Sequence, residues 1–322
     1  MKCKWIKKLT AGIIFLAAVG SLSGCQKAAT SENLFRDIEV NMTSVESAEE
    51  NQIVKLQMGD GDSAISQESN LDIEMTRNPA SVHRKGQQKT NMAGTKETQE
   101  MESYQVEEDG KTVIYSGTDE AWEKNAVEEK ETSSQQTVLF DGLQNLSGAF
   151  SVSQDLATVN KEECFELTGT ISGTQFQETF ADTLKALLGE DSSDLSGWNL
   201  QASEDEENNE ELQQKLNNVN VDCVIDIYRS NILPAKITFD LTDYLKAAGE
   251  ENAQVTSYTL EVTFVSYNDT KKIKVPKAVK ESAKDNGEDE AENSTDEMLE
   301  EENQEATAEG NPIGYRRCRT TK

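Results

Sequence analysis

The middle of the chain alternates apolar and polar residues with the two-residue period of a β-strand. The clearest apolar phases are Val54, Leu56 and Met58; Leu71, Ile73 and Met75; Ala235, Ile237, Phe239 and Leu241; and Tyr258, Leu260, Val262 and Phe264. Such alternation is typical of antiparallel sheets with one solvated face, whereas strands of a parallel sheet read as continuous apolar runs. The pattern predicts a large antiparallel sheet and argues against a doubly wound fold.

Weaker strand patterns predict further strands. They lie near residues 81–90, 97–106, 111–115 and 121–127, and the runs around Phe165 and Val221 alternate less cleanly. Asp109 and Gly110 form a typical two-residue hairpin turn between two of these runs. We therefore expect neighbouring strands here to be joined by short turns.

Apolar residues at helical spacing predict helices that cover the apolar face of the sheet. Leu34, Ile38, Met42 and Val45 predict a helix within residues 31–47. A second helical stretch is expected at 143–158, and a short helix or turn at 243–248. The best pattern ends before Gly189 and carries Phe176, Phe180, Leu184, Leu187 and Leu188 on one face. Strands and helices together predict an α+β domain.

The N-terminal residues have the pattern of a secretion signal. Four lysines precede an apolar run over residues 9–19, which is too short to span a bilayer. Leu22-Ser23-Gly24-Cys25 follows and resembles the lipobox of bacterial lipoproteins, whose cysteine carries a diacylglycerol and becomes the new N-terminus. We expect a signal peptide at 1–24 and a tether at 25–31. The Cys25 lipid would then hold the protein, extracytoplasmic, at the outer face of the cell membrane.

The charge is strongly negative, at −29 for the whole chain. Nucleic acid needs a basic protein surface, so nucleic acid is not an expected partner. Acidic residues gather in two segments that bury little: a predicted loop at 191–211 and a predicted disordered tail at 279–322. The folded domain is accordingly expected at 32–278.

Cysteine pairing can be judged from strand parity. Cys164 lies in the polar phase of its strand, because Phe165, Leu167 and Ile171 form the apolar phase. Cys223 lies in the apolar phase of its own strand. Directly opposed residues share a face, so the parity argues against a Cys164–Cys223 disulfide, although an extracytoplasmic setting permits one.

Residues with catalytic or metal-binding chemistry are sparse. His83 is the single histidine, and no Cys-x-x-Cys or His-Glu-x-x-His motif occurs. Asp60 and Asp62, with Gly59 and Gly61, fit a turn better than an EF-hand calcium loop. We therefore expect no catalytic residue, no metal site and no cofactor. Trp122 is interpreted as core packing and Trp198 as a loop anchor.

Several short segments carry a family resemblance. They are residues 41–45 (Asn-Met-Thr-Ser-Val), 115–124 (Tyr-Ser-Gly-Thr-Asp-Glu-Ala-Trp-Glu-Lys), 233–237 (Leu-Pro-Ala-Lys-Ile), 267–270 (Tyr-Asn-Asp-Thr) and 273–276 (Ile-Lys-Val-Pro). With the lipobox, they resemble the uncharacterised lipoproteins of Gram-positive bacteria that are similar to the LolA, LolB and LppX/LprG group. The resemblance implies a curved antiparallel half-barrel with helices over its concave face, an apolar cavity that carries lipids or lipoproteins, and no catalytic residue.

Two functions are compatible with these features. The first is a membrane-anchored lipoprotein that binds a lipid, an acyl chain or another hydrophobic small molecule. Its expected cavity lining is Phe176, Phe180, Leu184, Leu187, Leu260, Val262 and Phe264. The second is a non-enzymatic cell-envelope interaction module with a filled core, an acidic surface and an unknown protein partner.

Overall fold

The computed structural model describes residues 29–61, 64–118, 121–127, 142–188, 206–248 and 254–285, without the side chains of 127, 181–188, 206–210 and 285. Outside these residues lie the predicted signal peptide, Cys25, Trp198, Cys318 and the tail from residue 286. Part of the predicted tether and most of the acidic loop lie outside them too. Among the described residues, no helix is long and apolar enough to cross a membrane.

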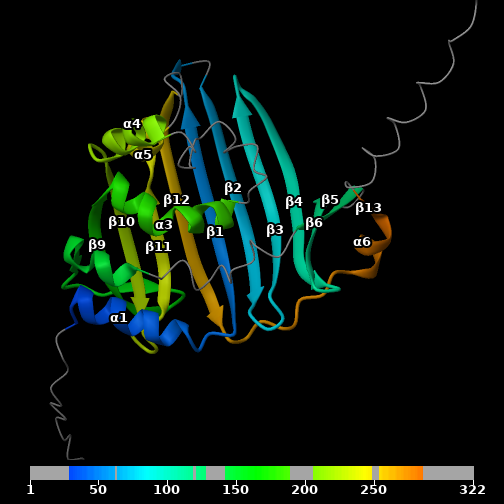
Figure 1. The fold of residues 1–322 in the computed structure, drawn as a ribbon, viewed down its shortest axis with the longest axis horizontal. Coiled ribbons are helices and arrows are strands. Elements are labelled where there is room, and N and C mark those ends of the chain that lie inside the picture. Colours follow the sequence, from blue (N-terminus) through cyan, green and yellow to red (C-terminus); the bar gives the residue numbers. More distant parts are fainter. Residues whose placement is uncertain are drawn as a thin grey trace, which may run out of the picture.

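One open sheet holds the thirteen strands of the described residues, in the order β13-β6-β5-β4-β3-β2-β1-β12-β11-β10-β9-β7, with β8 paired to β9. All pairs are antiparallel except β13 with β6. The strands are β1 Ser47–Met58, β2 Ile65–Thr76, β3 Ser81–Met92, β4 Thr95–Glu108, β5 Lys111–Thr118, β6 Ala121–Val127, β7 Phe150–Val152, β8 Ala157–Val159, β9 Glu162–Ser172, β10 Asn220–Tyr228, β11 Pro234–Asp240, β12 Val255–Tyr267 and β13 Ala283–Asp285. The predicted antiparallel sheet is confirmed (Figure 1).

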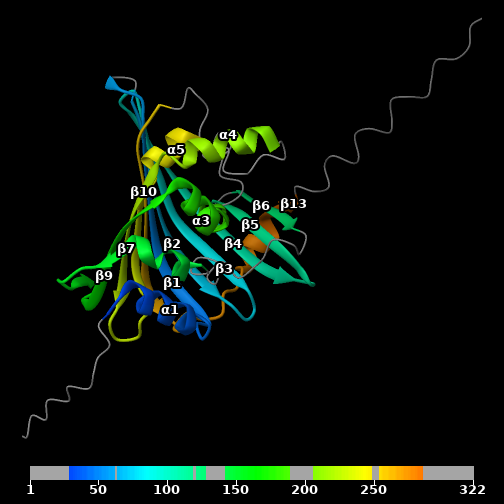
Figure 2. The same ribbon diagram turned by 60° about the vertical axis from the view of Figure 1, so that its left-hand side comes forward.

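The sheet curves, and most of the helices lie inside the curve (Figure 2). The helices are α1 Ser31–Met42, the 3-10 helix η2 Leu143–Ala149, α3 Gly173–Leu188, α4 Glu206–Leu216, α5 Thr242–Ala248 and α6 Lys277–Ser282. Figure 2 shows α1, α3, α4 and α5 on the concave side, whereas α6 lies next to β13 at the edge of the sheet (Figure 1). The predicted α+β half-barrel with helices over its concave face is confirmed.

Helix α1 follows directly from its sequence. The Thr30 hydroxyl caps its first turn by accepting a hydrogen bond from the Asn33 amide at 3.3 Å. Leu34, Phe35, Ile38 and Met42 are the buried positions, so one apolar stripe faces the sheet. The helix ends at Met42, earlier than the predicted range, but Val45 is also fully buried.

The main core lies between these helices and the concave face of β9 to β12 and β1. It joins α1, η2, α3, α4 and α5 to the apolar phases of the strands. Apolar side chains that alternate along a strand all reach the same face, so the period-two pattern of the sequence places them here. Burial of this surface is the main favourable term in the free energy of folding.

A second, smaller core lies on the convex face of β4 to β6. Tyr104, Val106 and Trp122 pack there against Ile273 and Val279, which follow β12 in the chain. The packing role predicted for Trp122 is therefore correct. The backbone of Ala283 pairs with Trp122 as β13 joins β6. The folded part thus continues to Asp285, which corrects the predicted boundary at 278.

Two further predicted segments differ in the structure. The helix expected at 143–158 is the short η2 followed by β7 and β8, because this stretch supplies edge strands that pair with β9. The acidic loop expected at 191–211 overlaps α4, which begins at Glu206. Glutamate, glutamine and leucine favour helices, and buried Leu216 fixes the end of α4 to the main core.

Tight turns and one close strand contact shape the sheet. Asp109 and Gly110 join β4 to β5 with φ values of 54° and 75°, as the predicted two-residue hairpin requires. Gly86 on β3 lies opposite Leu71 on β2. A Cβ at Gly86 would lie 2.0 Å from the carbonyl oxygen of Asn70, so only glycine allows the two strands to approach this closely.

Candidate functional site

The residues predicted to line a cavity gather on the concave face. Phe176 and Phe180 on α3, and Leu260, Val262 and Phe264 on β12, are all exposed by 2% or less and belong to the main core. The side chains of Leu184 and Leu187 lie outside the described part of α3. The structure thus brings five of the seven residues together. Full burial fits a filled core as well as a closed cavity, so their lining role stays a prediction.

An aromatic cluster joins α3 to α5 and β11. The Phe176 ring lies 5.3 Å from that of Phe239 and 5.0 Å from that of Tyr244, both edge to face. Phe180 contacts Phe239 in the same way at 5.0 Å. Rings at these separations have favourable quadrupole geometry. This cluster holds α3 against the apolar half of the concave face.

The concave face changes character across the sheet. One row of directly opposed residues runs from β11 to β4 through Phe239, Leu260, Val54, Ser69, Gln88 and Gln99. Phe239 and Leu260 are buried, Val54, Ser69 and Gln88 are half-buried, and Gln99 is exposed. The face is therefore apolar and covered on β11 and β12, and polar and accessible on β3 and β4.

Two buried polar residues stand between these halves. Glu50 and Gln52 on β1 are only 3% and 2% exposed. Glu50 pairs with Phe264 and Gln52 with Val262, so both side chains share the face of the main core. Oε1 of each residue is buried without a hydrogen-bond partner. Because an unsatisfied buried acceptor costs about 1 to 3 kcal/mol, such atoms need an explanation.

The electrostatics around Glu50 are those of a desolvated carboxyl. Burial raises its pKa to about 7, and the positive charge of Arg84 offsets only part of this effect. Arg84 lies on β3, directly opposite Ile73, which in turn lies opposite Glu50. Burial also lowers the pKa of the Arg84 guanidinium, while the Glu50 carboxylate opposes this shift. Strongly perturbed carboxyls are enriched at functional sites.

His83, the single histidine of the sequence, belongs to a hydrogen-bond network that links three strands. On the convex face its Nε2 lies 2.9 Å from the Glu102 carboxylate and its Nδ1 lies 3.3 Å from that of Glu74, and its ring stacks on Tyr104 at 4.3 Å. Partial burial raises the pKa of Glu102, but hydrogen bonds from Tyr104, His83 and Lys85 outweigh it and lower the pKa to about 2. Such a network ties β2, β3 and β4 together.

The two described cysteines are free thiols on opposite faces of the sheet. Cys223 belongs to the main core, and Cys164 packs on the other face with Val159 and Tyr228. Cys164 pairs with Tyr228 and Cys223 with Gly169, so the two cysteines are not opposed. The parity argument against a disulfide between them is confirmed.

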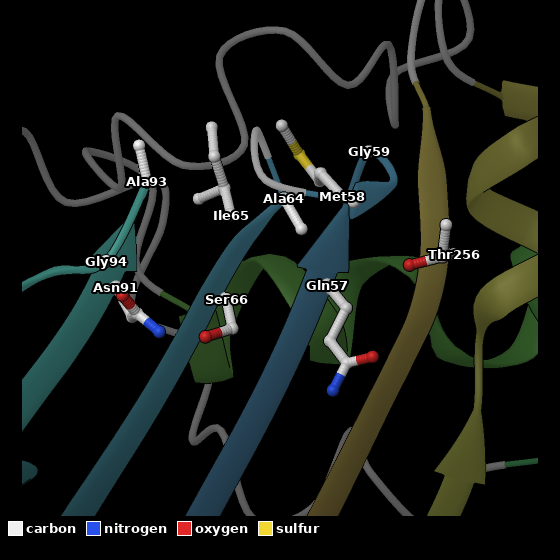
Figure 3. Close-up of a pocket in the computed structure, with 11 residues that line it drawn as sticks. Gln57, Met58, Gly59, Ala64, Ile65, Ser66, Asn91, Ala93, Gly94 and Thr256 are labelled. Atoms are coloured by element: carbon white, nitrogen blue, oxygen red, sulfur yellow. The ribbon is translucent and has the colours of Figure 1, made fainter.

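A pocket of about 560 Å³ lies at the tips of the β1–β2 and β3–β4 hairpins (Figure 3). The side chains of Gln57, Ser66 and Asn91 point to one side, and the glycine-rich turns form its end. The pocket includes Gly59 and Gly61 of the predicted turn, which does join β1 to β2. In the described residues, no group of three or more His, Cys, Asp or Glu could hold a metal ion.

Solved structures that align with about three quarters of this chain share little sequence with it. LprF from Mycobacterium bovis aligns with a TM-score of 0.42 and 11% identity over 76% of this chain and 96% of its own. Lipoprotein LppX from Mycobacterium tuberculosis gives 0.39 and 12% over 76% and 98%. A LolA superfamily protein from Nitrosomonas europaea gives 0.21 and 9% over 78% and 97%. Such values are too low to transfer a ligand from any of them.

Sequence comparison places the chain in a family. None of the curated proteins matches it in sequence. One family model matches residues 30–284, which include α1 and all but the last residue of the sheet. The chain therefore belongs to the family of unknown function DUF6612.

Proposed function

We propose that the protein is a lipid-anchored, extracytoplasmic lipoprotein that binds a hydrophobic ligand, such as a lipid or an acyl chain, on the concave face of its sheet. The observation that supports this proposal most directly is the change in polarity and burial along the row from Phe239 to Gln99. The side chains are apolar and buried at the Phe239 end and polar and accessible at the Gln99 end. A ligand with an apolar body and a polar end matches this gradient, because each part would meet surface of its own polarity.

The proposed anchor fits the position of α1. The lipobox cysteine, Cys25, precedes Ser31, the first residue of α1, by only six positions in the sequence. Helix α1 lies at the end of the sheet where β1 begins, opposite the hairpin tips (Figure 1). A lipid on Cys25 would hold this end of the sheet close to the membrane, where apolar ligands are stored. The proposal assigns no catalytic role to any residue.

The packing of the core favours the alternative. Phe176, Phe180 and Phe239 are buried and in mutual contact, as in a filled interior. In that case the protein is a non-enzymatic interaction module of the cell envelope, whose acidic surface meets a partner. The two functions differ in whether added bulk on the concave face blocks a ligand.

Two tryptophan substitutions at neighbouring positions of β2 distinguish ligand binding from the interaction module. Ser69 is half-buried on the concave face of β2, opposite Val54, and Glu68 is its neighbour on the convex face. Ser69→Trp in the full chain should reduce binding of a fluorescent fatty acid at least fivefold with an unchanged melting temperature. Glu68→Trp is the matched control and should bind like the wild type. Equal binding by both variants, or no binding by the wild type, would support the interaction module.

A further inference from the structure

Glu50 and Gln52 are two polar residues within an apolar part of the concave face. They are two residues apart on β1, so their side chains leave the same face roughly 7 Å apart. Their opposed residues on β12 are Phe264 and Val262, and on β2 they are Ile73 and Leu71. Four apolar side chains therefore surround two polar ones, on a strand that could carry Val or Leu at both positions.

Fold stability alone does not explain this arrangement. Replacing a buried, unsatisfied polar group with an apolar one of similar shape is often neutral or stabilising. Glu50 Oε1 and Gln52 Oε1 are both buried acceptors without a hydrogen-bond partner. A hydrogen-bond donor that approaches from the concave side could satisfy both of these neighbouring acceptors.

The charges nearby decide which donor fits. The Glu50 carboxylate and the Arg84 guanidinium interact and have opposite signs, so together they are close to neutral. An ammonium group would add a second cation beside Arg84. A phosphate or carboxylate group would add an anion beside Glu50 and would offer acceptors where donors are needed. A neutral hydroxyl donates without either conflict.

We propose that Glu50 and Gln52 recognise the hydroxyl-bearing head of an otherwise apolar ligand, with the Glu50 and Gln52 Oε1 atoms accepting hydrogen bonds from its hydroxyl groups. The ligand class is a neutral lipid alcohol, such as a glyceride with a free hydroxyl. This inference rests on the proposed function, because it assumes that an apolar ligand occupies the concave face. It adds that Glu50 and Gln52 bind the polar head of the ligand.

A pair of probes with the same acyl chain tests the inference. Radiolabelled 1-monooleoylglycerol offers two hydroxyls, whereas methyl oleate offers none. Each probe is equilibrated with the full chain immobilised through its C-terminal end, and the retained label gives the affinity. The wild type should bind monooleoylglycerol at least tenfold more tightly than methyl oleate. A site that rejects a partner lacking the expected hydrogen bond does so because its own polar groups stay unpaired.

Variants then assign the preference to this site. Gln52→Leu and Gln52→Met should each reduce the preference to less than threefold, because monooleoylglycerol loses a hydrogen-bond acceptor in both variants and methyl oleate has no hydroxyl that used it. Neither variant should lower the melting temperature, since each removes an unsatisfied acceptor, and two variants guard against one that misfolds. Gln57→Leu is the control, because Gln57 lies on the same strand but lines the hairpin-tip pocket.

The outcomes separate this inference from the proposed function. Equal binding of both probes by the wild type would overturn the headgroup inference and leave hydrophobic binding intact. A preference that survives both Gln52 variants would also overturn it. Loss of the preference in Gln57→Leu would move recognition to the hairpin tips and contradict it. If neither probe binds the wild type, the proposed function fails together with the inference.

Discussion

Glu50 lies directly opposite Phe264 in the antiparallel pairing of β1 with β12, so a carboxyl group and a core phenylalanine share one face of the sheet. Both are buried, at 3% and 2% exposure. Here the apolar, helix-covered half of the concave face meets its polar half.

Asp226 on the convex face should make the stability depend on pH. Burial first, and the Glu166 carboxylate second, raise its pKa from 3.8 to about 6, and its Oδ1 is buried without a hydrogen-bond partner. The folded chain therefore holds this proton more tightly than the unfolded chain. The contribution of Asp226 to the stability should fall as the pH rises from about 4 to 6 and be lost above that range, whereas Glu50, whose pKa is raised to about 7, should continue the decline to about pH 7.

Asp226→Asn tests this dependence. At pH 8 the variant should be more stable than the wild type by about 2 kcal/mol. A rise of the pKa from 3.8 to about 6 would correspond to about 3 kcal/mol, and solvent screening of the carboxyl lowers this value. Lys236 keeps its ion pair with Glu261 at 2.7 Å in the variant. Below pH 4 the two proteins should unfold alike in urea. Asp222→Asn, at an exposed position of β10, is the control and should shift neither curve. A destabilised Asp226→Asn at pH 8 contradicts the prediction.

Even a methyl side chain at position 86 should destabilise the fold. Gly86→Ala places a Cβ 2.0 Å from the Asn70 carbonyl oxygen, a backbone atom that cannot turn aside. The strands must then separate, at a cost of about 1 to 3 kcal/mol as for other overpacked sites. Gly148→Ala is the control, because a Cβ there meets nothing within 4 Å. Thermal unfolding of both variants decides the point, and equal melting temperatures would contradict the close approach of β2 and β3.

The segment from Val279 to Asp285 should stabilise the sheet, whereas the residues after it should not. Val279 is buried against the convex core, and Lys280 forms an ion pair with Glu108. Ending the chain at 278 should cost about 2 kcal/mol from lost apolar burial, or roughly 4 to 8 °C for a domain of this size. Ending it at 285 should leave the melting temperature nearly unchanged. Equal effects of the two truncations would show that α6 and β13 do not dock.

The sheet and its two faces could be predicted because local periodicity encodes them. The Asp109-Gly110 turn, the strands around it and the opposite faces of Cys164 and Cys223 all follow from patterns within a few residues. The pairing of β1 with β12 does not, since the two strands lie about two hundred residues apart and many strand orders would satisfy the same alternation. The docking of Val279 was missed because a single apolar residue in a charged segment has no period.

The candidate site was only partly predictable for a related reason. The sequence identified apolar residues such as Phe176 and Leu260, which the fold does bring together. Glu50 and Gln52 were missed, although both occupy the apolar phase of a strand that runs on through Val54 and Leu56. Polar residues in that phase were the available signal. Their burial depends on the neighbouring β12 and β2, which the sequence of β1 alone does not reveal.

Cys25→Ala should release the protein from membranes or block its processing. The proposed diacylglycerol on Cys25 is the anchor, and no helix of the described residues could replace it. Fractionation of cells that express the variant checks this, with the wild type as the control. A processed variant that stays with the membrane after a salt wash would contradict lipid anchoring.

The most direct test of hydrophobic ligand binding is mass spectrometry of the lipids that co-purify with the full chain. At least one lipid should be present in near-stoichiometric amount, and its amount should be strongly reduced in Ser69→Trp purified in parallel. Glu68→Trp should retain the wild-type amount. A wild-type protein that carries no lipid and takes up no fatty-acid probe would contradict ligand binding on the concave face.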